Sequence, residues 1–301
     1  MTEIERIIEK GIIKPEFLYD EIIDGCEVKS DLKKVWAVLI DLLYEFDKVC
    51  KKHNLKYWLA AGSLIGAVRH KGFIPWDDDL DVFMMRDDCD KLIQIAENEF
   101  NHPYFFQTPY SDKGYYFSFP KLRNSNTTAM SNDFVYEKFN QGIYLDIFPL
   151  DNCLEEGAQD RYDEIKELIM ENATYMRVHN PNPDIAEIER RKKYLLQNHN
   201  QIEVYEKMEY ICRQFNGIET DKVILAANTM APVEKHIYDR NWFEDTTYIS
   251  FYGIEAPLPI GYDCILRNRY GDYTIIPPAE EREWHSNEII DVNKSYIYYQ
   301  K

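Results

Sequence analysis

The chain has 301 residues, of which 45% are hydrophobic and 14% aromatic, a composition typical of a folded protein with a sizeable core. Its 35 basic residues are outnumbered by 53 acidic residues, which gives a formal net charge of -18. Such a field repels polyanions and argues against nucleic acid as the main partner. A small phosphorylated substrate stays compatible with it through a local basic pocket or a divalent cation.

The first half of the chain predicts alternating helices and strands. Residues 1–29 predict one or two surface helices, and Ser30 and Asp31 offer an N-cap for the long helix that follows. Apolar residues then recur at helical spacing, or in short runs typical of buried strands. The expected elements are helix 32–52, strand 57–61, helix 64–70, strand 80–85, helix 87–100, and strands 104–107, 115–123 and 143–148.

The second half changes character at about residue 155. Residues 155–215 are rich in Glu, Lys, Arg, Gln and Leu, are interrupted near 180–183, and predict two or three long helices. Short strands return after Thr220, with a helix over 262–270. The sequence therefore predicts an α+β fold with a mixed sheet core flanked by helices. Its three parts are 1–150, a helical segment 151–219 and a mixed C-terminal segment 220–301.

An acidic motif at residues 77–81 carries the chemistry. Four carboxylates within five positions repel one another, and a metal ion relieves that repulsion. Side chains alternate along a strand, so Asp79 and Asp81 point the same way, about 7 Å apart at Cα. Leu80 and Val82 then face the core. Two carboxylates so placed can hold one or two hard cations, Mg²⁺ or Mn²⁺, although an acidic cluster can also be a solvated loop.

Two further features fit the same site. Asp146 lies among apolar residues, where a carboxylate is costly unless it is paired or metal-bound, and we expect it to be the third ligand. Backbone donors alone can also satisfy a buried aspartate. Gly62 and Ser63 lie at a strand-to-helix turn, where a phosphate can approach the backbone and the hydroxyl can donate to it. A plain N-cap is the alternative for Ser63.

Three basic residues are candidates for phosphate contacts. Lys121 and Arg123 are two apart on an expected strand and share a face, which in so acidic a chain suits them to phosphate binding. A basic surface strand is the competing interpretation. Arg69 ends the helix that follows Ser63 and can reach substrate, but a helix C-terminus also favours cations for structural reasons.

The blocks that contain these residues resemble the LicD family, which includes bacterial phosphocholine transferases and is related to fukutin-type transferases. The resemblance spans about residues 35–285 and rests on separated blocks, namely 57–70, 72–82, 121–124, 145–151, 269–273 and 277–278. Residues 155–215 carry no matching motif.

The resemblance implies a nucleotidyltransferase-type fold and transfer of phosphocholine, or a related phospho-alcohol such as ribitol phosphate, from a CDP-activated donor to a glycan or glycolipid hydroxyl, with release of CMP. It implies a role in modifying lipopolysaccharide or teichoic acid. It also implies that Asp79, Asp81 and Asp146 are the metal-binding acids and that Gly62 and Ser63 are the phosphate-side motif. On the resemblance alone, Arg282, His285 and the turn at 270–272 close the pocket.

Three alternatives stay open at this point. A nucleotidyltransferase would attack the α-phosphorus of a nucleoside triphosphate and release pyrophosphate. A binding protein would hold a nucleotide or glycan without turnover, and a metal-dependent phosphohydrolase would act without an acceptor. The chain has no HExxH or GxxxxGK motif, which argues against a zinc hydrolase and a P-loop kinase.

The remaining features concern location. The six cysteines are scattered without a CxxC pair, which is typical of free thiols in a reducing compartment. Residues 1–10 are charged throughout and lack the apolar core of a signal peptide. We find no run of about 18 apolar residues and therefore expect a cytoplasmic protein without a membrane span.

Overall fold

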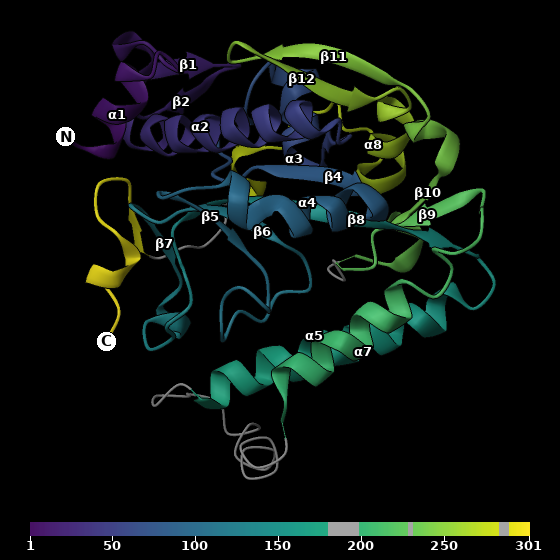
Figure 1. Cartoon of the computed structure of the whole chain (residues 1–301). Coiled ribbons are helices and arrows are strands. Elements are labelled where there is room, and N and C mark those ends of the chain that lie inside the picture. The colour runs from purple at the N-terminus through teal and green to yellow at the C-terminus, as the bar shows by residue number, and fades with distance from the viewer. Residues whose placement is uncertain (180–198, 228–230, 283–288) are drawn as a thin grey trace.

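A mixed sheet with helices on its faces lies at the centre of the computed structural model (Figure 1). The structure describes residues 1–179, 199–227, 231–282 and 289–301. In these ranges the sheet runs β10-β9-β8-β4-β3, and β6 pairs with β8 and carries β5 on its far side. The strands are β3 (Trp58–Leu59), β4 (Asp81–Met85), β5 (Tyr104–Gln107), β6 (Lys121–Asn124), β8 (Ile143–Cys153), β9 (Lys222–Ile224) and β10 (Ile237–Asp239).

Strand β8 organises this sheet because it pairs with three neighbours. It runs parallel to β4, with Asp81 opposite Asp146, and antiparallel to β6 and β9. Strand β3 adds to the far edge of β4 in the antiparallel sense. The parallel β4–β8 pair is connected by a long stretch that includes a helix, as parallel strands require. The sheet is therefore mixed, as the sequence predicts.

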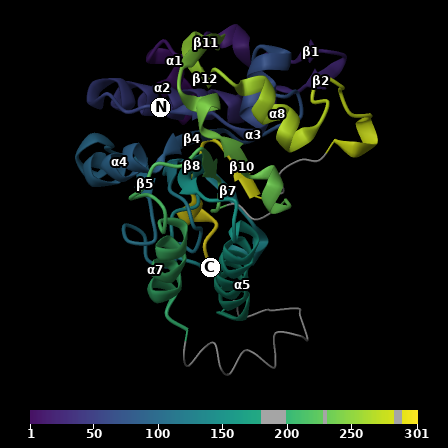
Figure 2. The same cartoon turned by 90° about the vertical axis from the view of Figure 1, so that its right-hand side faces the viewer.

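Helices cover the sheet on two sides. In Figure 1, α2 lies above the strands, and the α5–α7 pair lies below them; Figure 2 shows α5 and α7 side by side. The helices are α1 (Glu3–Glu9), α2 (Ser30–His53), α3 (Ala61–Ile65), α4 (Arg86–Glu99), α5 (Ala158–His179), α7 (Gln201–Cys212) and α8 (Tyr262–Tyr270). Three two-stranded sheets surround them, formed by β1 (Glu21–Ile23) with β2 (Cys26–Val28), β11 (Thr246–Phe251) with β12 (Ile254–Pro259), and β7 (Thr128–Met130) with β13 (Ile289–Asp291).

The long helix α2 forms because its apolar residues recur at helical spacing. It ends at Asn54, which adopts a left-handed conformation with φ of 54°. Trp36, Leu39 and Phe46 on this helix are fully buried in the main hydrophobic core. The apolar residues that alternate with the acids of β4 and β8 belong to the same core. Helix α2 therefore packs against one side of the sheet and holds it in place.

Several sequence predictions are confirmed. The helix over 262–270 has the predicted bounds, the helices over 32–52 and 87–100 match α2 and α4 within two residues, and the strand over 104–107 is β5. The described residues of 155–215 are mainly helical, in α5 and α7, which share a second apolar cluster with β9. The proposed division at residues 150 and 219 stays a prediction.

Other predictions were wrong in detail. Residues 21–28 form a hairpin rather than a helix, because Asp24 and Gly25 both adopt positive φ and make the tight turn between β1 and β2. Residues 115–120 are not a strand; their aromatic rings pack on one another, and only β6 enters the sheet. Strand β8 continues to Cys153, beyond the predicted end, because its last residues pair with β9.

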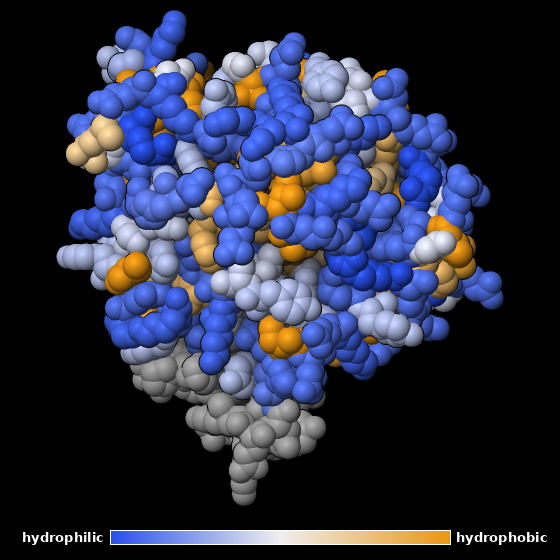
Figure 3. Space-filling view, in the orientation of Figure 1, coloured by the Kyte–Doolittle hydropathy of each residue, from blue (hydrophilic) through white to orange (hydrophobic). Residues whose placement is uncertain are grey.

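The face of the molecule seen in Figure 3 is mostly hydrophilic, with small scattered apolar patches. That appearance matches the acid-rich composition. Within the described ranges, no helix combines the length and the apolar character that a membrane crossing needs.

Candidate active site

A row of charged side chains crosses the sheet at one level. Lys121 of β6 is opposite Asp146 of β8, and Asp146 is opposite Asp81 of β4. Directly opposed residues on neighbouring strands project from the same face, so these three side chains lie together. All three are buried, with exposed fractions of 3%, 8% and 6% for Lys121, Asp146 and Asp81. The sheet thus brings two of the predicted acids and one predicted base into contact range of one another.

Lys121 is the most tightly enclosed member of the row. Its Nζ lies 2.6 Å from Asp146 Oδ1 and 3.6 Å from the centre of the Tyr144 ring, with Phe117 and Phe119 at 4.7 and 5.2 Å. Burial disfavours the ammonium form and lowers the pKa of Lys121 to about 8, although the charge of Asp146 works in the opposite direction. The lysine therefore keeps its charge at neutral pH, held by one carboxylate and three rings.

Arg123 lies on the same face but is bonded within the protein. Its Nε donates to Gln107, its Nη1 donates to the carbonyl oxygen of Gly142 at 2.7 Å, and its guanidinium lies 4.8 Å from the centre of the Tyr144 ring. Burial lowers the pKa of Arg123. These contacts make Arg123 a support of the site wall, and a direct phosphate contact stays a prediction.

The acidic motif lies in a loop that α2 fixes in place. The indole Nε1 of Trp36 donates to the backbone oxygen of Asp77 at 2.7 Å. Asp77, Asp78 and Asp81 are buried, and Asp79 is partly exposed. Strand β4 begins at Asp81, so strand alternation does not extend to Asp79, which the sequence predicted to share the strand. The paired acids do not project into bulk solvent.

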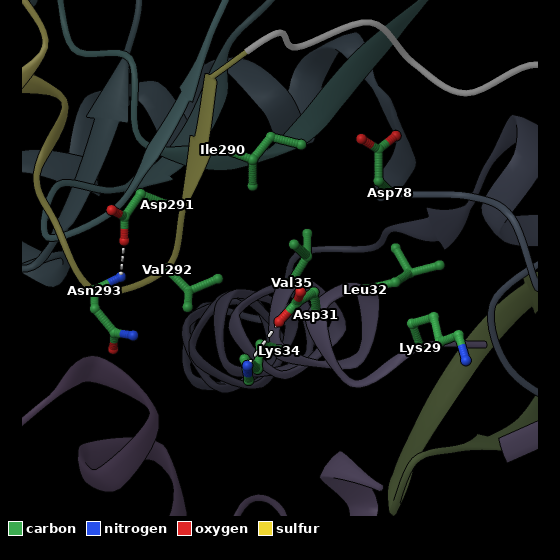
Figure 4. A pocket seen from close by; sticks show the side chains of 10 residues that line it. All are labelled: Lys29, Asp31, Leu32, Lys34, Val35, Asp78, Ile290, Asp291, Val292 and Asn293. Carbon is green, nitrogen blue, oxygen red and sulfur yellow. Dashed lines mark hydrogen bonds and ion pairs between the residues drawn. The ribbon is translucent and has the colours of Figure 1, made fainter. Parts of the chain in front are cut away.

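Asp78 borders a cavity of about 480 Å³ beside the acidic motif. Figure 4 shows the first turns of α2, strand β13 and Asp78 around it. The apolar part of its wall is formed by Leu32 and Val35 of α2 and by Ile290 of β13. Its polar lining residues are Lys29, Asp31, Lys34, Asp291 and Asn293. Asp78 lines this cavity, whereas Lys121, Asp146 and Asp81 do not.

Gly62 and Ser63 lie in α3 directly beside the acids. A Cβ atom on Gly62 would lie 2.7 Å from Asp77 Oδ2, so a larger residue at this position would displace the carboxylate of Asp77. The buried Ser63 hydroxyl accepts a hydrogen bond of 2.9 Å from the backbone nitrogen of Asp81. The turn and the strand that carries Asp81 are thus fixed to each other, and phosphate binding by this turn stays a prediction.

Arg69 connects this turn to the C-terminal segment. It lies in the single π-helical turn Gly66–His70 that follows α3, and its Nη1 donates to the backbone oxygens of Tyr273 and Ile275 at 2.7 and 3.2 Å. Those contacts give Arg69 a structural role, and its contact with substrate stays a prediction. His285 lies outside the described residues. Arg282, which is described, stacks over the Trp76 ring at 4.6 Å, at the start of the acidic motif.

The donor set has the chemistry that a hard cation prefers, namely carboxylate oxygens from adjacent strands. Within the described ranges, however, no three His, Cys, Asp or Glu side chains are grouped so that they could hold a metal ion. The ammonium of Lys121 is bonded to Asp146 instead. Magnesium or manganese binding by Asp79, Asp81 and Asp146 therefore stays a prediction. It requires that a metal ion replace the ammonium group of Lys121 beside Asp146.

Sequence reasoning missed two members of this site. Tyr144 lies under both Lys121 and Arg123, and Gln107 accepts from Arg123. The signal for Tyr144 was available, because it precedes Asp146 by two positions and so shares its face of β8. No local signal pointed to Gln107, whose place depends on the pairing of β5 with β6.

The domain thus combines helices and a mixed sheet. Its candidate site consists of the buried row of Lys121, Asp146 and Asp81 and the neighbouring turn at Gly62 and Ser63. The model of the LicD/FKTN/FKRP nucleotidyltransferase domain matches residues 54–152, which span that turn, the acidic motif and Asp146. This part of the chain is therefore similar to that class of domain.

The chain is similar to a member of the LicD family over most of its length. It is 25% identical to the lipopolysaccharide cholinephosphotransferase LicD of Haemophilus influenzae over 264 residues, which cover 85% of this chain and 96% of the relative. An uncharacterized protein of Rickettsia prowazekii is 32% identical over 154 residues, covering 51% of this chain and 53% of that protein. The human ribitol 5-phosphate transferase FKRP is 43% identical over 51 residues, which are 17% of this chain and 10% of the relative.

Proposed function

We propose that the protein is a metal-dependent phosphotransferase. It moves phosphocholine, or a related phospho-alcohol, from a CDP-activated donor to a hydroxyl group of a glycan or glycolipid, and releases CMP. One structural observation carries this proposal, which is the buried row of Lys121, Asp146 and Asp81 on one face of the sheet. The names of the two relatives, a cholinephosphotransferase and a ribitol 5-phosphate transferase, support the class of group transferred.

The reaction is a displacement at the phosphorus distal to the nucleoside. The acceptor oxygen forms the new P–O bond while the bond from that phosphorus to the bridging oxygen breaks, and CMP leaves with the bridging oxygen. Such transfers depend on positioning and on neutralising charge more than on covalent chemistry by the protein. Mg²⁺ or Mn²⁺ on Asp79, Asp81 and Asp146 would supply that neutralisation for the diphosphate.

The chain's own residues supply the other requirements. Asp146 is our preferred acceptor of the hydroxyl proton, because it lies in the row and is released when Lys121 moves from it. Lys121, still charged at neutral pH, can then donate to phosphate oxygens. The fixed contact between Ser63 and the start of β4 holds the acids in position relative to the turn.

The test is turnover of the Asp81→Asn variant. Purified protein is given Mg²⁺, CDP-choline or CDP-ribitol, and a glycan acceptor such as lipopolysaccharide or teichoic acid, and CMP is measured. We expect a loss of at least about a hundredfold in kcat, as for removal of other charge-stabilising groups. The matched control is Asp87→Asn, an exposed acid in the first turn of α4. A folded Asp81→Asn protein that releases CMP at the wild-type rate contradicts the proposal.

The domain description favours a second candidate, since the matching family model is that of a nucleotidyltransferase domain. Such an enzyme would attack the α-phosphorus of a nucleoside triphosphate. Its product would be pyrophosphate rather than CMP, so product analysis of the same assay with CTP as the donor separates the two.

A further inference from the structure

Arg269 in the last turn of α8 is a semi-buried cation whose hydrogen-bond partners are neutral. Its Nη1 donates to Nδ1 of His236 at 2.9 Å, and its Nε donates to the hydroxyl of Tyr270 at 3.1 Å. His236 is fully buried, and burial, with the neighbouring charge of Arg269, lowers its pKa to about 3, so it is neutral at neutral pH. Among the described residues, none of the ion pairs involves Arg269.

Three other arginines of this chain have anionic partners, since Arg6, Arg86 and Arg213 each pair with two carboxylates. Arg123 and Arg240 resemble Arg269 instead, because they donate to neutral oxygen atoms. A chain with 53 acidic residues has many carboxylates to offer. An enclosed guanidinium without an anionic partner is costly, and that cost is recovered when a bound anion supplies the missing charge.

The surroundings of Arg269 lead to the proposed active site. Helix α8 packs against α3, which carries Gly62 and Ser63. The hydroxyl of Tyr270, bonded to Arg269, is close enough to the acidic motif that the charges of Asp81 and Asp79 add to burial in raising the pKa of Tyr270. A group held between the acids and α8 would therefore meet the guanidinium.

We propose that Arg269 binds the diphosphate of the activated donor, with Tyr270 beside it. This inference rests on the proposed function and names one further substrate-binding residue. A guanidinium presents five N–H donors in a planar fork that suits phosphate oxygens. It would neutralise diphosphate charge that the carboxylates of the acidic motif cannot neutralise themselves. The position of Arg269 at the end of α8 also keeps the positive charge where the helix dipole favours it.

The experiment measures binding of CDP in the presence of Mg²⁺ by calorimetry, independently of turnover. We compare the wild-type protein with Arg269→Gln and Arg269→Lys. The matched control is Arg267→Gln, which removes an exposed arginine of the same helix that pairs with Asp263 at 2.8 Å. We expect Arg269→Gln to weaken CDP binding by about 10- to 100-fold, Arg269→Lys to weaken it less, and Arg267→Gln to leave it unchanged. The lysine variant keeps the cation at the helix end and guards against a folding defect in the glutamine variant.

Two results would overturn the inference. If Arg269→Gln lowers the melting temperature but binds CDP as tightly as the wild type, Arg269 only stabilises α8. If Arg269→Lys folds and neither its affinity nor the salt dependence of CDP binding changes, the guanidinium does not contact the diphosphate. In both cases the proposed phosphotransferase activity stands. A wild-type protein that binds no CDP contradicts the proposed CDP donor itself.

Discussion

Replacing Lys121 with methionine tests whether a lysine and a metal ion compete for Asp146. In the structure, the Lys121 ammonium lies 2.6 Å from Asp146 Oδ1 and is enclosed by the rings of Tyr144, Phe117 and Phe119. Methionine keeps the length and the apolar packing of the side chain but removes the charge. Asp146 then loses the ammonium group beside it, and a bound metal ion would replace the lost positive charge.

The structure sets the magnitude of the effect without metal. Removing one partner of a buried ion pair costs about 3–5 kcal/mol. Burial lowers the pKa of Lys121 from 10.5 to about 8, which corresponds to about 3 kcal/mol spent on keeping this ammonium charged at neutral pH. The methionine variant avoids that cost. We therefore expect the lower end, a loss of about 3 kcal/mol in the free energy of unfolding, seen as a drop of about 6 °C in Tm.

Magnesium should reverse much of this loss in the variant. A ligand present at a hundred times its Kd stabilises the native state by about 2.7 kcal/mol. In the wild-type protein, part of that gain is spent on breaking the pair between Lys121 and Asp146, so the rise in stability should be smaller.

The assay is chemical denaturation of both proteins in EDTA and in 10-fold steps of Mg²⁺. Lys33→Met is the matched control, because Lys33 is also buried, pairs with Glu21 and lies 5.3 Å from the Phe17 ring, away from the row. Its Mg²⁺ response should equal that of the wild type. Equal Mg²⁺ stabilisation of Lys121→Met and the wild type would refute the competition at Asp146.

Two further predictions concern stability. Burial lowers the pKa of His236 from 6.5 to about 3, so between these values the unfolded chain binds a proton that the folded protein does not, and stability is lost as the pH falls. Measured by chemical denaturation, the free energy of unfolding of the wild type should fall by about 2 kcal/mol more than that of His236→Asn when the pH is lowered from 6.5 to 5. An identical pH dependence in the two proteins would show that His236 is protonated in the folded state. Arg86→Met should lose about 3–5 kcal/mol, because this fully enclosed arginine pairs with Asp151 at 2.7 Å and Glu209 at 3.1 Å, whereas the half-exposed Arg213→Gln should lose about 1 kcal/mol or less by the same assay. Similar losses in the two arginine variants would contradict a special role for burial.

Sequence reasoning succeeded where the signal is local. The period of apolar residues predicts α2, α4 and α8 because an amphipathic helix must bury one face whatever it packs against. The hairpin at 21–28 also has a local signal, the Asp24-Gly25 turn, which was overlooked among charged residues. The aromatic stretch 115–120 misled the prediction because aromatic residues favour strands in general, whereas here their rings form a small cluster with Phe139 that excludes pairing.

The same distinction between local and long-range signals applies to the residues of the candidate active site. Alternation along single strands predicted that Asp146 is buried and that Lys121 and Arg123 share a face, and the structure confirms both. It did not predict that Lys121 would bond to Asp146, because that contact depends on how β6 pairs with β8. A shift of one residue in this pairing would turn Lys121 toward the opposite, apolar face.

The register of β6 against β8 therefore decides the chemistry available at this site. With Lys121 opposite Asp146, one of the two carboxylates in the row has a cationic partner before any ligand arrives, which lowers the cost of burying the two acids together. Under the proposed function, a divalent cation and a diphosphate would be a nearly balanced pair, so Lys121 would exchange one anionic partner for another while staying charged. If the proposed function holds, the lysine that pairs with Asp146 in the empty protein would be the group that meets the phosphate of the substrate.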